Sequence, residues 1–327
     1  MFGQPGSLAH LTMQEPDQDF TKEILRKVRQ IEIKSNRQVS EALAGSYHSA
    51  FKGQGIDFEE VREYQPGDEV RSIDWNVTAK MGVPFIKQYR EERELTILIA
   101  IDISGSLDFG SKQSSKREKL AELGALLAFS ANLNGDKVGL LLFSDRVEKY
   151  LPPAKGQKHV LRILREILFH DNESRQTDLV EGVRFINKVL NRRAIIFYLS
   201  DFIFPESSEQ DLEAKETEEI FLHELSATRR KHDLVCAQIM DSAEIELPDC
   251  GLVRLQDAES DHSPHVLADF SDPIFRQKYQ NFQQEKRALF SKKLKKRGIE
   301  SFPFLTDSDY LLELKEFFNR RGKRRGF

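Results

Sequence analysis

The apolar positions of the chain fall into two recurring patterns. Short uninterrupted apolar runs are typical of strands buried on both faces, and apolar residues spaced by three and four are typical of helices that bury one face. Strands are therefore predicted at 95–101, 138–143, 194–200, 234–240 and 300–304. Helices are predicted at 20–43, 115–133, 158–169, 178–190, 209–231, 273–297 and 309–321.

The order of these elements predicts the fold class. Strands that alternate with helices imply an α/β fold in which a mostly parallel sheet carries helices on both faces. Residues 146–151 are expected to add an antiparallel edge strand to this sheet. The helix at 115–133 has clear ends, because Ser115 stands three residues before Glu118 as in a capping box, and Asn134–Gly135 is a common helix stop.

Residues 45–94 differ from the rest of the chain. They are punctuated by glycine, carry charges of both signs and contain the only tryptophan. Pro66–Gly67 favours a turn, because proline fixes φ at the second turn position and glycine accepts a positive φ at the third. The pattern at 83–89 is strand-like, so short strands joined by this turn are expected.

The chain is therefore expected to have four parts. Residues 1–44 form an N-terminal tail and amphipathic helix, residues 45–94 form the segment with short strands, residues 95–321 form the α/β domain, and residues 322–327 form a basic tail. A length of 327 residues suits one large domain with such additions.

Composition indicates a cytoplasmic location. No run approaches the ~20 apolar residues needed to span a bilayer, and the N-terminus lacks the basic-then-apolar pattern of a signal peptide. Cys236 and Cys250 give neither a disulfide framework nor a zinc-binding spacing, which fits a reducing compartment.

The net charge of −4 hides an uneven distribution, because residues 206–224 are rich in acids and residues 286–297 are rich in bases. Solvated helix faces are the favoured interpretation, and electrostatic complementarity with a partner is the alternative. The bases at 286–297 and 320–325 could also contact nucleic acid or anionic lipid. Because they lack interleaved aromatic residues, a solvated helix and tail is favoured and no nucleic-acid partner is expected.

Hydroxyl and carboxylate groups gather where the predicted strands end. In an open α/β sheet, ligands bind at the carboxyl ends of the strands. Oxygen groups without a nearby histidine or cysteine suit Mg²⁺, with Mn²⁺ or Ca²⁺ as alternatives, rather than zinc or copper. Thr177 is also a candidate N-cap for the helix that follows it. The candidate ligands are Asp102, Ser104, Ser106, Thr177 and Asp201.

These five residues resemble the metal-ion-dependent adhesion site of von Willebrand factor type A domains. The resemblance implies that the serines and the threonine bind the metal directly or nearly so, and that the aspartates act directly or through water. It also implies that one coordination position stays open for a partner's carboxylate. The third loop reads Ser200–Asp201–Phe202, where type A domains often have Thr-Asp-Gly.

The segment at 45–94 contains a set of glycine, aromatic and charged residues in a distinctive order: Gly53, Gly55, Phe58, Arg62, Glu63, Tyr64, Pro66, Gly67, Asp68, Arg71, Ile73, Asp74, Trp75, Glu91 and Glu92. With these residues the segment resembles the bacterial family known as domain of unknown function 58, in which such a segment precedes a type A domain. The resemblance implies association with MoxR-type AAA+ ATPases, in systems thought to act like chaperones during the maturation of protein complexes.

Residues 45–94 also offer candidate docking residues. Arginines interleaved with acids can form a fixed network of ion pairs that covers a sheet edge, and a docking surface is the alternative. The candidates for docking are Arg62, Tyr64, Asp68, Arg71, Asp74 and Trp75.

The expected function is a non-enzymatic, metal-dependent protein-interaction module that works with a MoxR-type ATPase or captures an acidic side chain of a client. One alternative is a structural scaffold with a vestigial metal site that docks through residues 45–94. A second alternative is a Mg²⁺-dependent phosphatase of the haloacid dehalogenase type, with Asp102 as nucleophile. That mechanism needs an acid two residues later, where this chain has Ser104.

Overall fold

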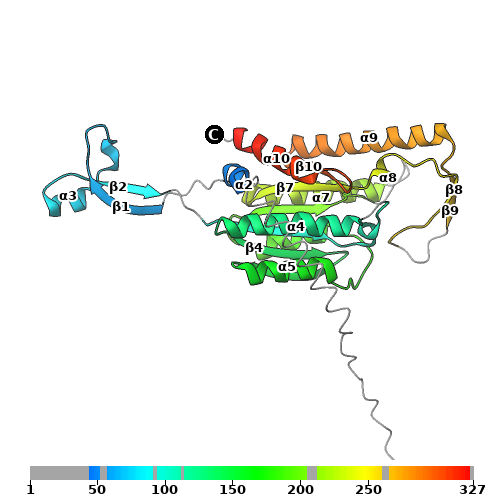
Figure 1. Ribbon diagram of the computed structural model, residues 1–327, viewed down its shortest axis with the longest axis horizontal. Coiled ribbons are helices and arrows are strands. Elements are labelled where there is room, and N and C mark those ends of the chain that lie inside the picture. The colour runs from blue at the N-terminus through cyan, green and yellow to red at the C-terminus, as the bar shows by residue number, and fades with distance from the viewer. Residues whose placement is uncertain are drawn as a thin grey trace, which may run out of the picture.

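The computed structural model describes residues 44–51, 57–90, 94–111, 114–204, 212–259 and 265–324. At its centre is a six-stranded sheet with strand order β10-β7-β6-β3-β4-β5 (Figure 1). β5 runs antiparallel to β4 and all other neighbours are parallel, which confirms the predicted mostly parallel sheet with an antiparallel edge strand. The strands are β3 (Thr96–Asp102), β4 (Lys137–Phe143), β5 (Val147–Ala154), β6 (Ile195–Ser200), β7 (Asp233–Met240) and β10 (Glu300–Leu305).

Helices pack on both faces of the sheet, as the sequence predicts. Alternate residues of β3 point to opposite faces, so Ile97, Ile99 and Ile101 join one buried cluster while Leu98 and Ala100 join the other. On the first face lie α2 (Ala44–Phe51), α4 (Lys116–Leu133), α5 (Gln157–Phe169) and α10 (Tyr310–Arg324). On the second lie α6 (Leu179–Val189), α7 (Leu212–Lys231) and α9 (Pro273–Lys296).

The ends of α4 follow the predicted capping signals. The hydroxyl of Ser115 accepts the Glu118 N–H at 3.2 Å, which satisfies one of the free donors in the first turn. Gly135 follows the helix with φ of 74°, a left-handed conformation that glycine adopts without strain.

The chain order of the central strands creates a switch point at the carboxyl end of β3. The connection from β3 leads through α4 to β4 on one side, and the chain later returns to β6 on the other side of β3. Loops that leave adjacent strands in opposite directions open a crevice between them. Asp102 ends β3 and Asp201 follows β6, so the two residues lie at the carboxyl ends of neighbouring strands.

Residues 57–90 form a separate two-stranded unit, which Figure 1 shows beside the main domain. β1 (Asp57–Glu63) pairs antiparallel with β2 (Phe85–Arg90), which confirms two short strands. Their connection is longer than the predicted Pro66–Gly67 turn, because it also contains α3 (Trp75–Met81). The Asp74 side chain accepts the N–H groups of the first turn of α3, and a left-handed glycine follows the helix.

α2 packs with the main domain, although it falls in the predicted 45–94 segment. Phe51 and Tyr47 are buried, and both rings contact Phe318 of α10. Asp136 joins α2 to β3, because its Oδ2 accepts the Tyr47 O–H at 3.0 Å and its Oδ1 accepts the Leu95 N–H at 2.9 Å. The β1–β2 unit is therefore an insertion between two segments that both belong to the main domain.

The predicted helix at 20–43 and the signature residues Gly53, Gly55, Glu91 and Glu92 lie outside the described residues. α10 extends to Arg324 and so includes part of the predicted tail at 322–327. Within the described part of the chain, no helix is both long and apolar enough to cross a membrane.

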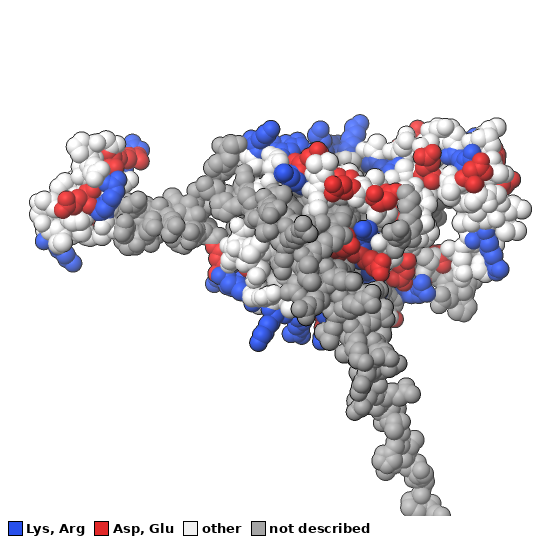
Figure 2. Space-filling model, viewed as in Figure 1, with Lys and Arg blue, Asp and Glu red and all other residues white. Residues whose placement is uncertain are grey.

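The acidic and basic helices pair with each other. Lys293 of α9 lies 2.7 Å from Glu218 of α7, and Arg297 lies 2.7 Å from Glu219. Figure 2 shows further lysine and arginine side chains along the edge formed by α10 and the neighbouring end of α9. The acidic and basic segments therefore stabilise each other in part through ion pairs, in addition to forming the solvated helix faces that the sequence predicts.

Arg321 differs from the solvated role predicted for the basic residues at 320–325. Its guanidinium is buried, pairs with Asp233 and with Glu300 at 2.6 Å, and lies 4.5 Å from the centre of the Phe51 ring. The reason is its position on the buried stripe of α10, one turn after Phe317 and Phe318.

Candidate metal centre

Asp102 is the last residue of β3 and is fully buried. Its Oδ1 accepts the Ser104 N–H at 2.9 Å, and its Oδ2 accepts the Ser200 O–H at 2.8 Å. Burial, together with the negative charge of Asp201, raises the pKa of Asp102 to about 7. The two hydrogen bonds thus fix the carboxyl group in a place where its negative charge is disfavoured.

The two serines of the Asp-x-Ser-x-Ser motif turn toward the second aspartate. A 3-10 turn at Gly105–Asp108 follows Ser104 and brings the Ser106 hydroxyl 3.2 Å from the Ser104 hydroxyl. Ser106 donates to Asp201 Oδ2 at 2.8 Å. Two predicted ligands that are 95 positions apart in sequence therefore meet across the ends of neighbouring strands.

Phe202 holds the loop of Asp201 in an unusual conformation. Its φ of 52° lies in the left-handed region, which is costly for a bulky residue. The ring is buried 5.2 Å from that of Phe290 and 6.0 Å from that of Tyr198. This aromatic packing offsets the backbone strain and fixes the direction in which Asp201 leaves β6.

Thr177 does not cap the helix that follows it. Asp178 caps α6 instead, because its Oδ1 accepts the N–H groups of Val180 and Glu181 at 2.8 and 3.2 Å. The Thr177 hydroxyl is therefore available elsewhere and donates to Glu259 Oε1 at 2.5 Å.

The threonine loop also touches the serine loop. The Gly105 N–H donates to the Arg175 carbonyl at 2.9 Å. The backbone of the second loop thus approaches the Asp-x-Ser-x-Ser motif two residues before Thr177.

Lys116 is a site residue that the sequence analysis missed. It is the first residue of α4 and is fully buried, with its Nζ 3.0 Å from Asp201 Oδ2 and 2.6 Å from Glu244 Oε1. Burial by itself lowers the pKa of Lys116, but the charges of Asp201 and Glu244 raise it above its ordinary value. A signal was present, because a lysine in the first turn opposes the helix dipole and so needs a local anion.

Glu259 is a second missed residue. It follows β8 (Leu252–Leu255) and is half-buried beside Thr177. Burial raises the pKa of Glu259, and the negative charge of Asp201 adds to this effect. No periodic pattern marks this residue, which lies in a polar loop 82 positions from its partner Thr177.

The donor set is one of hydroxyl and carboxylate oxygens. Within the ranges that the structure describes, no three histidine, cysteine, aspartate or glutamate side chains form a metal-binding group, so a cation held here would need hydroxyl oxygens among its ligands. The ammonium of Lys116 pairs with the carboxyls of Asp201 and Glu244, and the charge of Asp201 also opposes those of Asp102 and Glu259. A hard divalent cation fits both the oxygen donors and this excess of negative charge.

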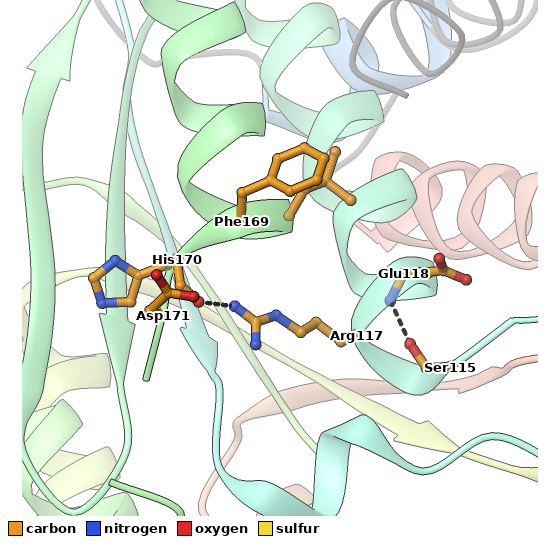
Figure 3. Close-up of a pocket in the computed structure, with 7 residues that line it drawn as sticks. Ser115, Arg117, Glu118, Phe169, His170 and Asp171 are labelled. Atoms are coloured by element: carbon orange, nitrogen blue, oxygen red, sulfur yellow. Dashed lines mark hydrogen bonds between the residues drawn. The ribbon is translucent and has the colours of Figure 1, made fainter. Parts of the chain in front are cut away.

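A pocket of about 320 Å³ lies between the start of α4 and the end of α5 (Figure 3). Arg117 extends along it and donates to the His170 carbonyl, which ties the end of α5 to α4. None of the predicted metal ligands lines this pocket. It is lined by Ser115, Arg117, Glu118, Leu168, Phe169, His170 and Asp171.

The β1–β2 unit places the predicted docking residues in different roles. Arg62 grips Asp68 with two N–H groups at 2.8 and 2.9 Å, and these hydrogen bonds lower the pKa of Asp68. Asp74 caps α3. Tyr64 is half-buried and Arg71 is exposed. Trp75 leaves 67% of its surface exposed.

Comparison with known proteins identifies the family. A family model described as "Protein of unknown function DUF58" matches residues 60–289. The chain belongs to the DUF58 family. The matched range contains Asp102, Ser104, Ser106, Thr177 and Asp201, so membership applies to the part of the chain that carries the candidate metal centre.

Mycobacterial relatives of this DUF58 protein are uncharacterized. A protein of Mycobacterium tuberculosis is 29% identical over 302 residues, which cover 91% of this chain and 89% of the relative. A protein of Mycobacterium avium is 25% identical over 150 residues, which cover 46% of this chain and 78% of the relative.

Solved structures with some similarity to this chain include a conserved hypothetical protein, BatB, from Bacteroides thetaiotaomicron. It is 14% identical, with a TM-score of 0.42, and the match covers 70% of this chain and 99% of BatB. The PilB minor pilin from Streptococcus sanguinis is 12% identical with a TM-score of 0.38, over 74% of this chain and 64% of the pilin.

Proposed function

We propose that this DUF58 protein is a non-enzymatic, Mg²⁺-dependent protein-interaction module with a von Willebrand factor type A fold. The observation that carries the proposal is the hydrogen bond of 2.8 Å between Ser106 and Asp201, which joins two motif loops at the switch point of the sheet. The open α/β sheet with its ligand residues at the carboxyl ends of adjacent strands supports the same proposal.

In this proposal the protein's own residues prepare the site. Ser104, Ser106 and Thr177 offer hydroxyl oxygens to the cation, and Asp102 and Asp201 offer carboxylates or hold its water. The Ser104 N–H and the Ser200 hydroxyl keep Asp102 in place. Lys116 keeps Asp201 in place from within the domain. The bound cation would supply a positive charge and a coordination position for a carboxylate of the partner.

The partner in this proposal is a MoxR-type AAA+ ATPase or a client protein that presents an acidic side chain, and the location is the cytoplasm. Binding to a purified MoxR-type ATPase from the same genome, measured in Mg²⁺ and in chelator, tests it. Ser104→Ala is expected to weaken binding in Mg²⁺ to the level seen in chelator, because it removes one hydroxyl donor from the buried site.

Ser308→Ala is the matched control, because the hydroxyl of this serine hydrogen-bonds with the Leu305 carbonyl and the Glu313 side chain, neither of which is a proposed ligand. Circular dichroism of both variants checks that the fold is intact. Equal binding by wild type and Ser104→Ala, with and without Mg²⁺, would contradict the proposal.

A second candidate function is a scaffold that docks through the β1–β2 unit. Exposed apolar side chains favour it, since Val70, Trp75 and Met81 leave 60%, 67% and 64% of their surfaces exposed. This function predicts that Trp75→Ala abolishes binding while Ser104→Ala and chelation leave it unchanged.

A further inference from the structure

The segment 256–259 of the chain lies directly against the first loop of the candidate metal centre. A Cβ atom added to Gly105 would lie 2.3 Å from the Ala258 carbonyl oxygen. Glycine is therefore required between Ser104 and Ser106 for this approach, because any larger residue would push the segment away.

The residue after Ala258 reaches the second loop. Glu259 accepts a hydrogen bond from the Thr177 hydroxyl at 2.5 Å. Asp257 fixes the approach, because its Oδ1 accepts the Glu259 N–H at 2.9 Å. The segment thus delivers a carboxylate of this chain to a hydroxyl that belongs to the proposed donor set.

A carboxylate at this point adds to an existing excess of negative charge. Asp201 lies close enough to oppose the charge of Glu259. Like charges in a partly desolvated site repel, and a divalent cation ligated by both carboxylates would turn this repulsion into attraction. Glu259 is therefore placed where an acidic group gains most from a bound cation.

The two-stranded sheet next to this segment is largely exposed. Segment 256–259 follows β8, which pairs with β9 (Val266–Asp269) in a sheet of two strands. Leu252, Val266 and Leu267 leave 75%, 58% and 70% of their surfaces exposed, so few apolar contacts hold this sheet on the domain. Two-stranded sheets have little stability of their own, and displacing the segment would cost little.

We infer that Glu259 is a further ligand of the metal centre, which supplies the carboxylate in the free protein and is displaced by the acidic side chain of a partner. This inference rests on the proposed function. Binding is then a competition between two carboxylates. The apparent association constant for a partner equals the intrinsic constant multiplied by the fraction of molecules in which Glu259 is not bound to the cation.

Mn²⁺ binding to the full chain tests the inference, with affinity read by electron paramagnetic resonance and the number of metal-bound waters read by water-proton relaxation. Glu259→Gln is expected to bind Mn²⁺ roughly tenfold or more weakly, and its complex is expected to hold one additional exchangeable water. Glu246→Gln is the matched control, because it makes the same change at an exposed glutamate outside segment 256–259. It is expected to leave both readings unchanged.

A second variant changes the approach of the segment and keeps its carboxylate. Gly105→Ala is expected to push Ala258 and Glu259 away and to add the same water. Unchanged affinity and an unchanged water number in Glu259→Gln would overturn the inference while leaving the proposed function standing. A wild-type protein that binds no Mn²⁺ would overturn both.

Discussion

Replacing Lys116 with methionine tests whether the buried ammonium and a cation compensate the same carboxylates. The Lys116 side chain is fully buried, and its Nζ is 3.0 Å from Asp201, whose side chain is 4% exposed. Methionine fills a similar volume without charge, so Asp201 would be left buried with one fewer partner. Removing one partner of a buried ion pair costs ~3–5 kcal/mol.

The expected loss lies at the lower end of that range. Glu244, the other partner of Lys116, is 27% exposed and can recover solvation when the ammonium is removed. We expect Lys116→Met to lower the free energy of unfolding by about 3 kcal/mol in chelator. A cation present at 100 times its dissociation constant adds about 2.7 kcal/mol. Because the variant lacks a competing positive charge, Mg²⁺ should stabilise it more than it stabilises the wild type.

Urea unfolding in chelator and in saturating Mg²⁺ measures both effects. Lys137→Met is the control, since this lysine pairs with Glu94 at 2.6 Å at the surface, where the two side chains are 46% and 39% exposed, and its loss should cost less than about 1 kcal/mol. The reasoning is refuted if Lys116→Met is as stable as the wild type in chelator. It is also refuted if Mg²⁺ stabilises both proteins by the same amount.

Two further predictions concern the buried charges of the fold and of the site. Arg321→Met should lower the free energy of unfolding by about 3 kcal/mol, because it leaves Asp233 and Glu300 without their buried partner, whereas exposed Arg320→Met should cost less than about 1 kcal/mol in the same urea titration. Asp102 has a pKa raised to about 7, so the folded protein holds a proton that the unfolded chain releases, and the stability of the chelated protein should fall between about pH 4 and pH 7 and then level off. Asp102→Asn should remove that pH dependence, and in chelator above about pH 7 its free energy of unfolding should be a few kcal/mol higher than that of the wild type. Urea titrations across this pH range measure it, and an unchanged pH dependence in the variant would contradict the assignment.

The parts of the fold that sequence predicts are those decided by local pattern. β3, β4 and β6 are buried on both faces, so their apolar runs are unmistakable, and Ser115 marks the start of α4 by a local hydrogen bond. Asp102, Ser104 and Ser106 follow a predicted strand, and Asp201 follows its neighbour. The parallel sheet then brings these four residues together without further information.

The parts that sequence missed depend on contacts between distant segments. Lys116 meets Asp201 across 85 positions and Glu259 meets Thr177 across 82, and neither pairing leaves a periodic signal. α3 was missed for a different reason, because the Pro66–Gly67 turn was expected to connect the two strands directly and left no room for a helix between them. Its two caps, Asp74 and Gly82, were legible in the sequence.

The position of Asp136 has a mechanical consequence. Its carboxylate accepts hydrogen bonds from Tyr47, which precedes the β1–β2 unit, and from Leu95, which follows it. The two chain segments that lead into and out of the insertion are therefore both bonded to one residue. A pull on the insertion would load these hydrogen bonds and the buried Phe51 before it reached the strands of the sheet. Asp136 thus gathers the load from both ends of the insertion near the start of β3, whereas Asp102 lies at the opposite end of that strand.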